Sequence, residues 1–271
     1  MNLNKRLQDN TVEIDYGFAP ARYLTVFFIS LGVSVLLSAT YFTLMSYSLW
    51  FILITWIVGA DLIIVGVIWH IMMGFAGSKK LSRKLNKQFI DFLRKIWDGK
   101  GKVLDIGTGA GRAAVESARA FPETEVTGID IWTNAWVRFG LSKERAQRNA
   151  QLAGVNDRCV FKKGSALEIP FEDNSFQLVV SSFVFHEIRI PDRIELFREA
   201  IRVLEKNGTF VICDAYRYIK GYNVDDIMEL VNKIQQLGAA NVGYISIQDA
   251  GTDIVFAGRF WKIGFIYGKK I

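Results

Sequence analysis

The feature that most constrains this chain is a stretch of 38 residues, 23–60, that contains no Asp, Glu, Lys or Arg. After Asp61 the next charged residue is Lys79. A polar break at residues 46–48 divides the region into two apolar segments, about 23–46 and 49–75, and each is long enough to cross a bilayer core of about 30 Å. The sequence therefore predicts a two-helix transmembrane hairpin over residues 23–78, preceded by a polar segment over residues 1–22.

A secretory signal peptide is the alternative for the first apolar segment. Such a peptide has a short apolar core near the start of the chain and a cleavage site with small residues. The first 22 residues here are polar and mixed in charge. The pattern therefore favours an anchor that stays in the mature protein.

Charge at the ends of the hairpin predicts its orientation. The loop between the two segments is uncharged, whereas residues 79–102 hold nine Lys and Arg against two Asp, a local charge of +7. The rest of the chain therefore sums to −1 of its net +6. Because basic residues stay on the cytoplasmic side, we expect an integral membrane protein with both termini and the following domain in the cytoplasm.

Residues 79–99 form a basic linker with apolar residues at helical spacing, and so predict an amphipathic helix. One reading is that residues 79–97 dock on anionic lipid headgroups. The other is that the apolar stripe packs on the following domain, and the two stay open. Nucleic acid is not expected as a partner, because no basic and aromatic interleaving continues into that domain.

Small and polar residues inside the spans predict how the helices associate. Ser30, Ser34 and Ser38 share one face of the first helix. We expect this small-residue face to pack closely against Gly59 and Gly66 of the second helix and to stabilise the hairpin, while the spans could also form a homo-oligomer. Polar groups are also present in the second span, at Asp61 near its middle and at His70 near its cytoplasmic end. An ionised carboxylate at mid-membrane is costly, so we expect Asp61 to face a partner or to stay protonated, with a role in substrate binding as the alternative.

From residue 100 onward, short apolar runs alternate with amphipathic segments, which is typical of an α/β sheet. We expect helices near residues 112–120, 141–153, 192–204 and 224–237. The last two strands should form an antiparallel pair at one edge of the sheet, so that an otherwise parallel sheet has an antiparallel edge strand. The predicted strands are KVLDIG, EVTGID, CVFKKG, FQLVVSS, TFVICDA, VGYISI and WKIGFIYGKK.

The stretch VLDIGTGAGR, residues 103–112, places three glycines between a strand and a helix. Missing side chains allow tight turns and let backbone amides approach a ligand, so a nucleotide-type pocket is expected at this edge. The dinucleotide fingerprint needs a third glycine where Arg112 stands, which disfavours a hydride-transfer enzyme.

These residues resemble the class I S-adenosylmethionine-dependent methyltransferase family, with motifs like those of its methyltransferase-11 group, over residues 100–271. The resemblance implies a Rossmann-like sheet of seven strands and S-adenosylmethionine as the cofactor. The glycine loop would pass under the methionine end of the cofactor, which Asp105 helps to order. In VTGIDIW, Asp130 would accept hydrogen bonds from both ribose hydroxyls, with Ile131 and Trp132 near the adenine.

Further motifs follow in the family's order. GSALEIPFEDNSFQLVVSS would bring Ser165 and Ala166 to the adenine edge, although the family often has Asp in place of Ser165, and AIRVLEKNGTFVICDAY precedes and forms the fifth strand. The implied cofactor-binding residues are Asp105, Gly107, Thr108, Gly109, Gly111, Asp130, Ile131, Trp132, Ser165, Ala166 and Leu167.

The acceptor side is expected in the loops after the fourth and fifth strands, because ligands collect at those carboxyl ends. His186 would accept a proton from the nucleophile, with a structural role as the alternative, while Glu187 would cap or pair locally. Asp214, Tyr216 and other residues of DAYRYIKGY, including Tyr218 and Tyr222, would shape the acceptor pocket or merely cover the core. No metal site is expected, because the two Cys and two His are scattered without ligand spacing.

The combined prediction is a membrane-anchored methyltransferase whose acceptor is a lipid or another hydrophobic molecule resident in the membrane. A membrane-anchored binding or assembly protein without turnover is the alternative from another class. A methyltransferase of a soluble small molecule is a further alternative.

Overall fold

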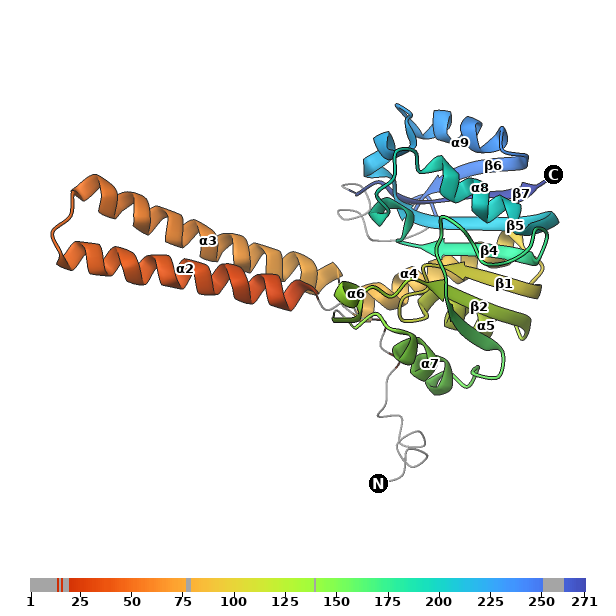
Figure 1. Ribbon diagram of the computed structural model, residues 1–271, viewed down its shortest axis with the longest axis horizontal. Helices are drawn as coiled ribbons and strands as arrows, with labels where there is room; N and C mark the ends of the chain where they lie inside the picture. The colour runs from red at the N-terminus through yellow and green to blue at the C-terminus, as the bar shows by residue number, and fades with distance from the viewer. Residues whose placement is uncertain (1–13, 15, 17–19, 77–78, 139, 251–260) are drawn as a thin grey trace, which may run out of the picture. The chain divides into compact units, whose positions relative to one another are not determined.

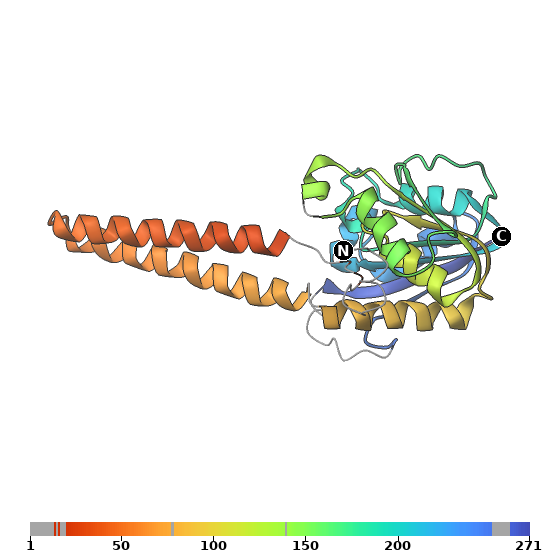
Figure 2. The same ribbon diagram turned by 90° about the horizontal axis from the view of Figure 1, so that it is seen from below.

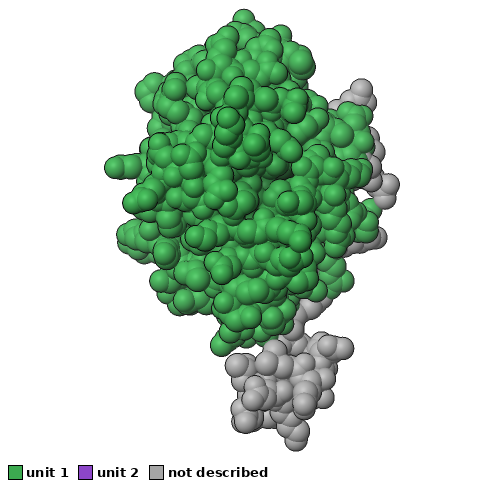
Figure 3. All heavy atoms as spheres, turned by 90° about the vertical axis from the view of Figure 1, so that its right-hand side faces the viewer, with its two compact units in different colours: residues 1–16, 83–271 green, residues 17–82 purple. Residues whose placement is uncertain are grey.

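The computed structural model describes residues 14, 16, 20–76, 79–138, 140–250 and 261–271. Apart from residues 14, 16 and 20–22, the polar segment expected at residues 1–22 lies outside the described residues. The chain divides into two compact units, residues 17–82 and residues 1–16 with 83–271. Figure 1 labels their elements, and Figure 3 shows one face of the larger unit in green.

The smaller unit is a helical hairpin of α2 (Pro20–Leu44) and α3 (Leu49–Ala76). Glycines lie where the two helices touch: a Cβ atom on Gly32 would lie 2.9 Å from the carbonyl oxygen of Gly59, and one on Gly66 would lie 3.1 Å from the Cβ of Phe28. Missing side chains let the backbones approach closely. Gly59 and Gly66 thus lie in the contact, as expected, together with Gly32.

The three serines do not lie in this contact, so that part of the prediction is wrong. Ser30, Ser34 and Ser38 are exposed, and their hydroxyls donate to the carbonyl oxygens four residues earlier at 2.6, 2.9 and 3.0 Å. Such back-bonding satisfies a hydroxyl within its own helix. The face that meets α3 instead contains Gly32 and Ala39, both buried.

Both helices are long and apolar enough to cross a membrane, over Val26–Leu44 and Leu49–Ile68. Only 11% of each apolar window is buried, unlike the core helix of a globular domain. Large side chains such as Leu37 and Trp50 face outward with 67% and 77% of their surface exposed, and Asp61 is exposed as well. Exposed apolar surface of this extent is typical of a region that contacts a membrane or another protein.

The linker helix is α4 (Lys79–Ile96), whose apolar side packs on the sheet of the larger unit. Leu93 is fully buried, and the ring of Phe92 stacks on Phe265 with ring centroids 4.9 Å apart. Figure 2 shows this helix, in gold, alongside the sheet. Of the two readings left open for the apolar stripe, packing on the domain is the one observed. The exposed face keeps basic residues such as Arg83, Lys87 and Arg94.

The larger unit contains one sheet of seven strands in the order β3-β2-β1-β4-β5-β7-β6. β1 pairs in parallel with both β2 and β4, so the strand order reverses beside β1, the position where α/β sheets bind ligands. The expected Rossmann-like, mostly parallel sheet is confirmed. Its strands are β1 (Lys100–Ile106), β2 (Glu123–Asp130), β3 (Cys159–Lys163), β4 (Phe176–Ser182), β5 (Leu204–Ala215), β6 (Ala239–Ser246) and β7 (Ile263–Lys270).

The last two strands form the expected antiparallel pair at one edge of the sheet, but the strand that runs against the others is β7 and not the edge strand β6. β7 pairs antiparallel with both β5 and β6, and β6 forms the edge. The helix between β5 and β6 is a crossover connection, so β6 runs in the same direction as β5. The chain then turns back, and β7 fills the place left between β6 and β5.

Helices cover both faces of the sheet and enclose two hydrophobic cores. On one face, α4, α5 (Arg112–Ala120) and α7 (Lys143–Leu152) pack around residues such as Ala114; on the other, α8 (Ile194–Arg202) and α9 (Ile227–Gln235) pack around Phe197. The structure adds a short helix, α6 (Asn134–Arg138), and two 3₁₀ helices, η1 (Phe185–Glu187) and η2 (Tyr216–Tyr222), in segments that the sequence left as loops.

Candidate functional site

The glycine loop lies at the carboxyl end of β1, where it passes into α5. Gly107, Gly109 and Gly111 have φ angles of 70°, 54° and 83°, which side chains with a Cβ rarely adopt. The amides of Gly107 and Thr108 donate to the carbonyl oxygen of Ile129 at 2.8 and 2.9 Å. A Cβ on Gly107 would overlap Val184, which follows β4. The loop is therefore tied to β2 and is closely covered by the segment after β4.

Asp105 is 1% exposed beneath this loop. Its Oδ2 accepts hydrogen bonds from the Thr108 hydroxyl at 2.7 Å and from the Ala114 amide at 3.0 Å. Its Oδ1 is buried and has no hydrogen-bond partner among the described residues. Burial raises the pKa of the Asp105 carboxyl to about 7. A buried acceptor of this kind is compensated by a positively charged or hydrogen-donating ligand group.

Asp130 ends β2 and is fastened to the same loop. Its Oδ2 accepts a hydrogen bond from the Gly109 amide at 2.9 Å, and its Oδ1 accepts one from the Trp132 amide at 2.8 Å. Burial raises the pKa of Asp130, while these backbone donors oppose the shift. A carboxylate has about four lone-pair sites, so Asp130 keeps capacity for further donors such as the hydroxyls of a diol.

Apolar groups lie beside Asp130 at the ends of neighbouring strands. Ile131 follows β2 and Leu167 follows β3, and they are 47% and 46% exposed. Ser165 and Ala166 are half-buried, and the Ser165 hydroxyl accepts a hydrogen bond from the Leu167 amide at 3.1 Å. The two exposed aliphatic side chains fit the flat, apolar faces of a nucleobase.

Trp132 plays a part that the sequence did not indicate. Its indole Nε1 donates to the carbonyl oxygen of Gly109 at 2.9 Å, and its φ of 39° is unusual for a bulky residue. The ring is thus fixed to the glycine loop. Together with the Asp130 contact, this hydrogen bond joins the tip of β2 to the loop after β1.

Asn149 of α7 is a further loop residue that sequence reasoning missed. It is 2% exposed, and its side-chain amide donates to the carbonyl oxygen of Ala110 at 2.9 Å. Its position in the sequence could have indicated this role, because Asn149 shares the buried face of α7 with Ala146 and Ala150. A polar side chain on an apolar helix face requires a buried partner.

His186 lies in η1 after β4 and is held by carboxylates. Its Nδ1 pairs with Oδ1 of Asp214, and its Nε2 lies 3.2 Å from Oε1 of Glu187. Burial disfavours the imidazolium, but the hydrogen bonds to Asp214 and Glu187 outweigh it and raise the pKa of His186 to about 9. The ring is therefore mostly protonated at neutral pH, which favours positioning of η1 over the acceptance of a proton.

The tyrosines after β5 are not gathered around one pocket. Tyr216 is 2% exposed, and its hydroxyl donates to the carbonyl oxygen of Ile212 at 3.0 Å. Tyr222 is 1% exposed, whereas Tyr218 is 47% exposed. Tyr216 and Tyr222 belong to the hydrophobic core, which agrees with the alternative that these tyrosines only cover the core. Of the three, only Tyr218 is exposed enough to contact an acceptor.

Within the described ranges, no group of three or more His, Cys, Asp or Glu residues is placed to hold a metal ion. Cys159 and Cys213 are buried free thiols. Burial raises the pKa of the Cys159 thiol to about 12 and that of Cys213 further, so both stay protonated at neutral pH.

The geometry agrees with the group that the sequence implied. An unpaired buried carboxylate oxygen fits the ammonium of S-adenosylmethionine, the Asp130 carboxylate fits its ribose diol, and exposed Ile131 and Leu167 fit its adenine. The expected residues at the ends of β1, β2 and β3 are therefore brought to one edge of the sheet. His186 lies at the end of β4 at the same edge.

Comparison with known proteins gives the same assignment. Residues 103–208 match the family described as methyltransferase domain. The chain is 37% identical over 113 residues to the 27-O-demethylrifamycin SV methyltransferase of Amycolatopsis mediterranei, covering 42% of this chain and 38% of the relative. It is 35% identical over 117 residues to the demethylmenaquinone methyltransferase of Roseiflexus castenholzii, covering 43% of this chain and 44% of the relative. The chain thus spans less than half the length of these curated relatives.

Solved structures share the fold. The geranyl diphosphate C-methyltransferase of Streptomyces coelicolor, solved with geranyl diphosphate and S-adenosylhomocysteine, superposes with a TM-score of 0.53 at 16% identity, covering 74% of this chain and 83% of that chain. The matched segment therefore resembles a methyltransferase domain, and the solved structures share its fold. This family uses S-adenosylmethionine, so the expected cofactor is confirmed at the level of the family.

Proposed function

We propose that this protein is a membrane-anchored methyltransferase that transfers the methyl group of S-adenosylmethionine to a hydrophobic acceptor resident in the bilayer. The observation that carries the proposal is the joined carboxyl edge of β1 and β2, where Asp130 accepts a hydrogen bond from the Gly109 amide. This contact joins the glycine loop to the carboxylate that we assign to the ribose diol.

The reaction depends mainly on positioning. S-adenosylmethionine supplies an electrophilic methyl group on a sulfonium, and a nucleophile held in line at about 3 to 3.5 Å displaces it. The chain's own residues bind and orient the cofactor through Asp105 and Asp130. His186, protonated between Asp214 and Glu187, fixes the segment after β4 and adds positive charge near the acceptor side.

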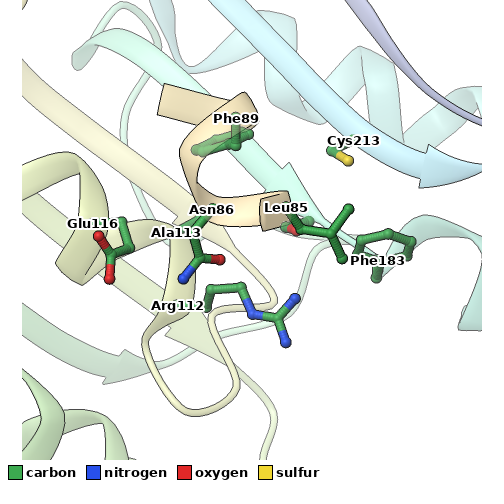
Figure 4. Close-up of a pocket in the computed structure, with 9 residues that line it drawn as sticks. Leu85, Asn86, Phe89, Arg112, Ala113, Glu116, Phe183 and Cys213 are labelled. Atoms are coloured by element: carbon green, nitrogen blue, oxygen red, sulfur yellow. The ribbon is translucent and has the colours of Figure 1, made fainter. Parts of the chain in front are cut away.

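Within the larger unit, α4 runs from the carboxyl edge of the sheet, where Leu85 lies near Phe183 and Cys213 (Figure 4), back to the start of β1.

Anchoring itself is part of the proposal. The exposed apolar surfaces of α2 and α3 fit a lipid environment, and the uncharged turn with the basic α4 supports a cytoplasmic domain. The exposed basic face of α4 is suited to anionic headgroups, with the apolar face already packed on the sheet. In this setting Asp61 faces a second copy of the hairpin or a polar group of the acceptor.

The names of the relatives agree with a hydrophobic acceptor. Those relatives are named for a demethylmenaquinone and for a rifamycin precursor. We infer the same class of acceptor here: an isoprenoid or quinone ring, or another apolar molecule.

The test is methyl transfer by the full-length protein in lipid nanodiscs. Methyl-labelled S-adenosylmethionine is added with lipids extracted from the source organism, and the lipid and aqueous fractions are counted separately. We expect label in the lipid fraction and none with Asp130→Ala. Label confined to soluble acceptors would reject the membrane-resident acceptor, and cofactor binding without any turnover would favour an assembly protein.

A further inference from the structure

Two short segments border the expected acceptor side of the sheet. η1 (residues 185–187) follows β4 and η2 (residues 216–222) follows β5, and these strands are parallel neighbours, so both segments lie at the carboxyl edge. Neither segment is a regular α-helix, and Tyr218 inside η2 has φ and ψ angles of −93° and 41°, which are not helical. The carbonyl groups of such segments lack a regular ladder, so side chains supply their partners.

Arg193, the residue before α8, supplies these partners for both segments. On the η1 side, its guanidinium donates from Nη2 to the carbonyl oxygen of His186 at 2.7 Å and from Nε to that of Ile188 at 2.9 Å. On the η2 side, Nη1 donates to the carbonyl oxygen of Tyr218 at 3.3 Å, and the backbone amide of Arg193 donates to that of Gly221 at 2.8 Å. One residue thus joins the segment after β4 to the segment after β5.

These contacts require the shape of an arginine. A guanidinium carries its N–H donors in a rigid planar fork, whereas a lysine ammonium is a single point charge on a flexible stem. The fork reaches carbonyl oxygens on two segments from one position. The ring of Tyr222 lies beside it, with its centroid 6.0 Å from Cζ of Arg193. Gly221 leaves the space for the fork, because a Cβ there would lie 2.8 Å from the same Cζ atom.

Other contacts hold the surrounding fold independently of the Arg193 side chain. The Asp214 carboxylate accepts a hydrogen bond from the His186 amide at 3.1 Å and also pairs with its ring. Lys233 of α9 binds the carboxylate of Asp192 at 2.7 Å. The core contacts of both segments therefore do not depend on the guanidinium, which instead sets the spacing between the outer parts of η1 and η2.

We propose that Arg193 is a positioning residue that fixes the spacing between η1 and η2, and thereby the place of the acceptor relative to the methyl group. This inference rests on the proposed function, because it needs an acceptor on this side of the sheet. Arg193 acts through the two segments and not on the reacting atoms. A misplacement of about 1 Å lowers the rate of a positioned reaction roughly 100-fold. Loss of the guanidinium should therefore slow methyl transfer while the cofactor residues after β1 and β2 stay in place.

The test measures methyl transfer and cofactor binding in the same variants. The full-length protein in nanodiscs receives the lipid extract and methyl-labelled S-adenosylmethionine at saturation. Arg193→Met should lower the rate by roughly 10- to 100-fold and leave the affinity for S-adenosylhomocysteine unchanged. Arg193→Lys should recover little of the rate, because it restores the charge but not the fork. The matched control is Arg198→Met, which removes an exposed arginine of α8 that pairs with Glu195 and should change neither quantity.

A second variant displaces the guanidinium without removing it. The new methyl group in Gly221→Ala would overlap the guanidinium of Arg193, which is the far end of a flexible side chain and has to leave its acceptors. Gly221→Ala should therefore lower the rate in the same way as Arg193→Met. Adding it to Arg193→Met should cause no further loss, because both substitutions remove the same contacts. Additive losses would contradict the shared mechanism.

Hydrogen exchange reports on the two segments without turnover. Arg193→Met should speed amide exchange in residues 185–190 and 216–222 and leave the strands unchanged. An unchanged rate of transfer, full recovery by Arg193→Lys or a weaker affinity for S-adenosylhomocysteine would overturn the inference. Faster exchange over the whole domain would overturn it as well, because Arg193 would then only stabilise the fold. If the unsubstituted protein transfers no methyl group to the extract, the proposed function itself is overturned, whereas the exchange result still decides whether Arg193 holds the two segments.

Discussion

The carboxylate of Asp130 accepts a hydrogen bond from the backbone amide of Gly109 at 2.9 Å, across the ends of two neighbouring strands. The contact joins two motifs that are 21 residues apart in the sequence. It means that the protein's own hydrogen bonds hold the loop and the carboxylate in one arrangement. Such constraint reduces the ordering that ligand binding requires.

Asp105 predicts a pH dependence of cofactor binding. Its pKa is raised from 3.8 to about 7, so the carboxyl gains its charge only near neutral pH. Because the ionised form attracts the ammonium, the affinity for S-adenosylhomocysteine should rise between pH 6 and pH 8, as measured by calorimetry. In Asp105→Asn the affinity should be lower at pH 8, and this rise should be absent. Asp157→Asn, an exposed control, should keep the rise.

The same residue predicts an opposite effect on stability. A carboxyl whose folded pKa is raised binds more protons when folded, so its contribution to stability is present below about pH 4 and is lost as pH rises towards 7. Asp105→Asn should therefore melt at or above the temperature of the unsubstituted protein at pH 8 while binding less cofactor. A lower melting temperature at that pH would contradict the assigned burial.

Asn149 should stabilise the loop from below. Asn149→Ala leaves the buried carbonyl oxygen of Ala110 without this donor, a loss of about 1–3 kcal/mol. We expect a melting temperature lower by several degrees in differential scanning fluorimetry and a weaker affinity for S-adenosylhomocysteine. The control is Gln151→Ala, which changes an exposed residue of the same helix. Equal effects of the two substitutions would show that the contact contributes little.

His186 predicts a stability effect in the alkaline range. Its pKa is raised from 6.5 to about 9, so its pairing contributes fully below about pH 6.5 and is lost as pH rises through 9. The difference in melting temperature between the unsubstituted protein and His186→Gln should be largest near pH 6 and should shrink by pH 9.5. The rate of methyl transfer should show no titration near pH 6.5. A limb at that pH, lost in His186→Gln, would instead identify His186 as the proton acceptor.

The hairpin contact is testable by cross-linking. A Cβ on Gly66 would lie 3.1 Å from that of Phe28, so cysteines at these positions should form a disulfide on oxidation. A protease site placed in the turn at residues 45–48 separates the two halves on a gel unless they are linked. The pair Ser30→Cys and Gly66→Cys is the control and should stay separable. A disulfide formed only by the pair with Ser30→Cys would show that the serine face of α2 contacts α3, and would contradict the structure.

The sequence predicted the sheet and its ligand edge because both follow from local patterns. Strand and helix periodicity, together with glycines at Gly107 and Gly109, are legible without tertiary contacts. The order of β6 and β7 in the sheet could not be predicted in this way. The same pattern of apolar residues suits an antiparallel strand at an edge and one that lies between two other strands. The burial of Tyr216 and the pairing of His186 with Asp214 depend on segments that are far apart in the sequence.

The hairpin shows the same limit. The length and composition of residues 23–60 predict two apolar helices, but composition does not say which face of α2 meets α3. Serine supports close packing only where its hydroxyl is not better placed on its own helix, and here each hydroxyl reaches the carbonyl oxygen four residues earlier.

The most direct measurement is calorimetric titration of the full-length protein with S-adenosylmethionine, compared with Asp130→Ala and with the exposed control Asp157→Ala. We predict binding by the unsubstituted protein and by the control. Asp130→Ala should bind more weakly by about 2–3 kcal/mol, because the ribose diol and the Gly109 amide both lose a charged acceptor. Equal affinity in all three proteins, or no binding in any of them, would contradict the assigned site.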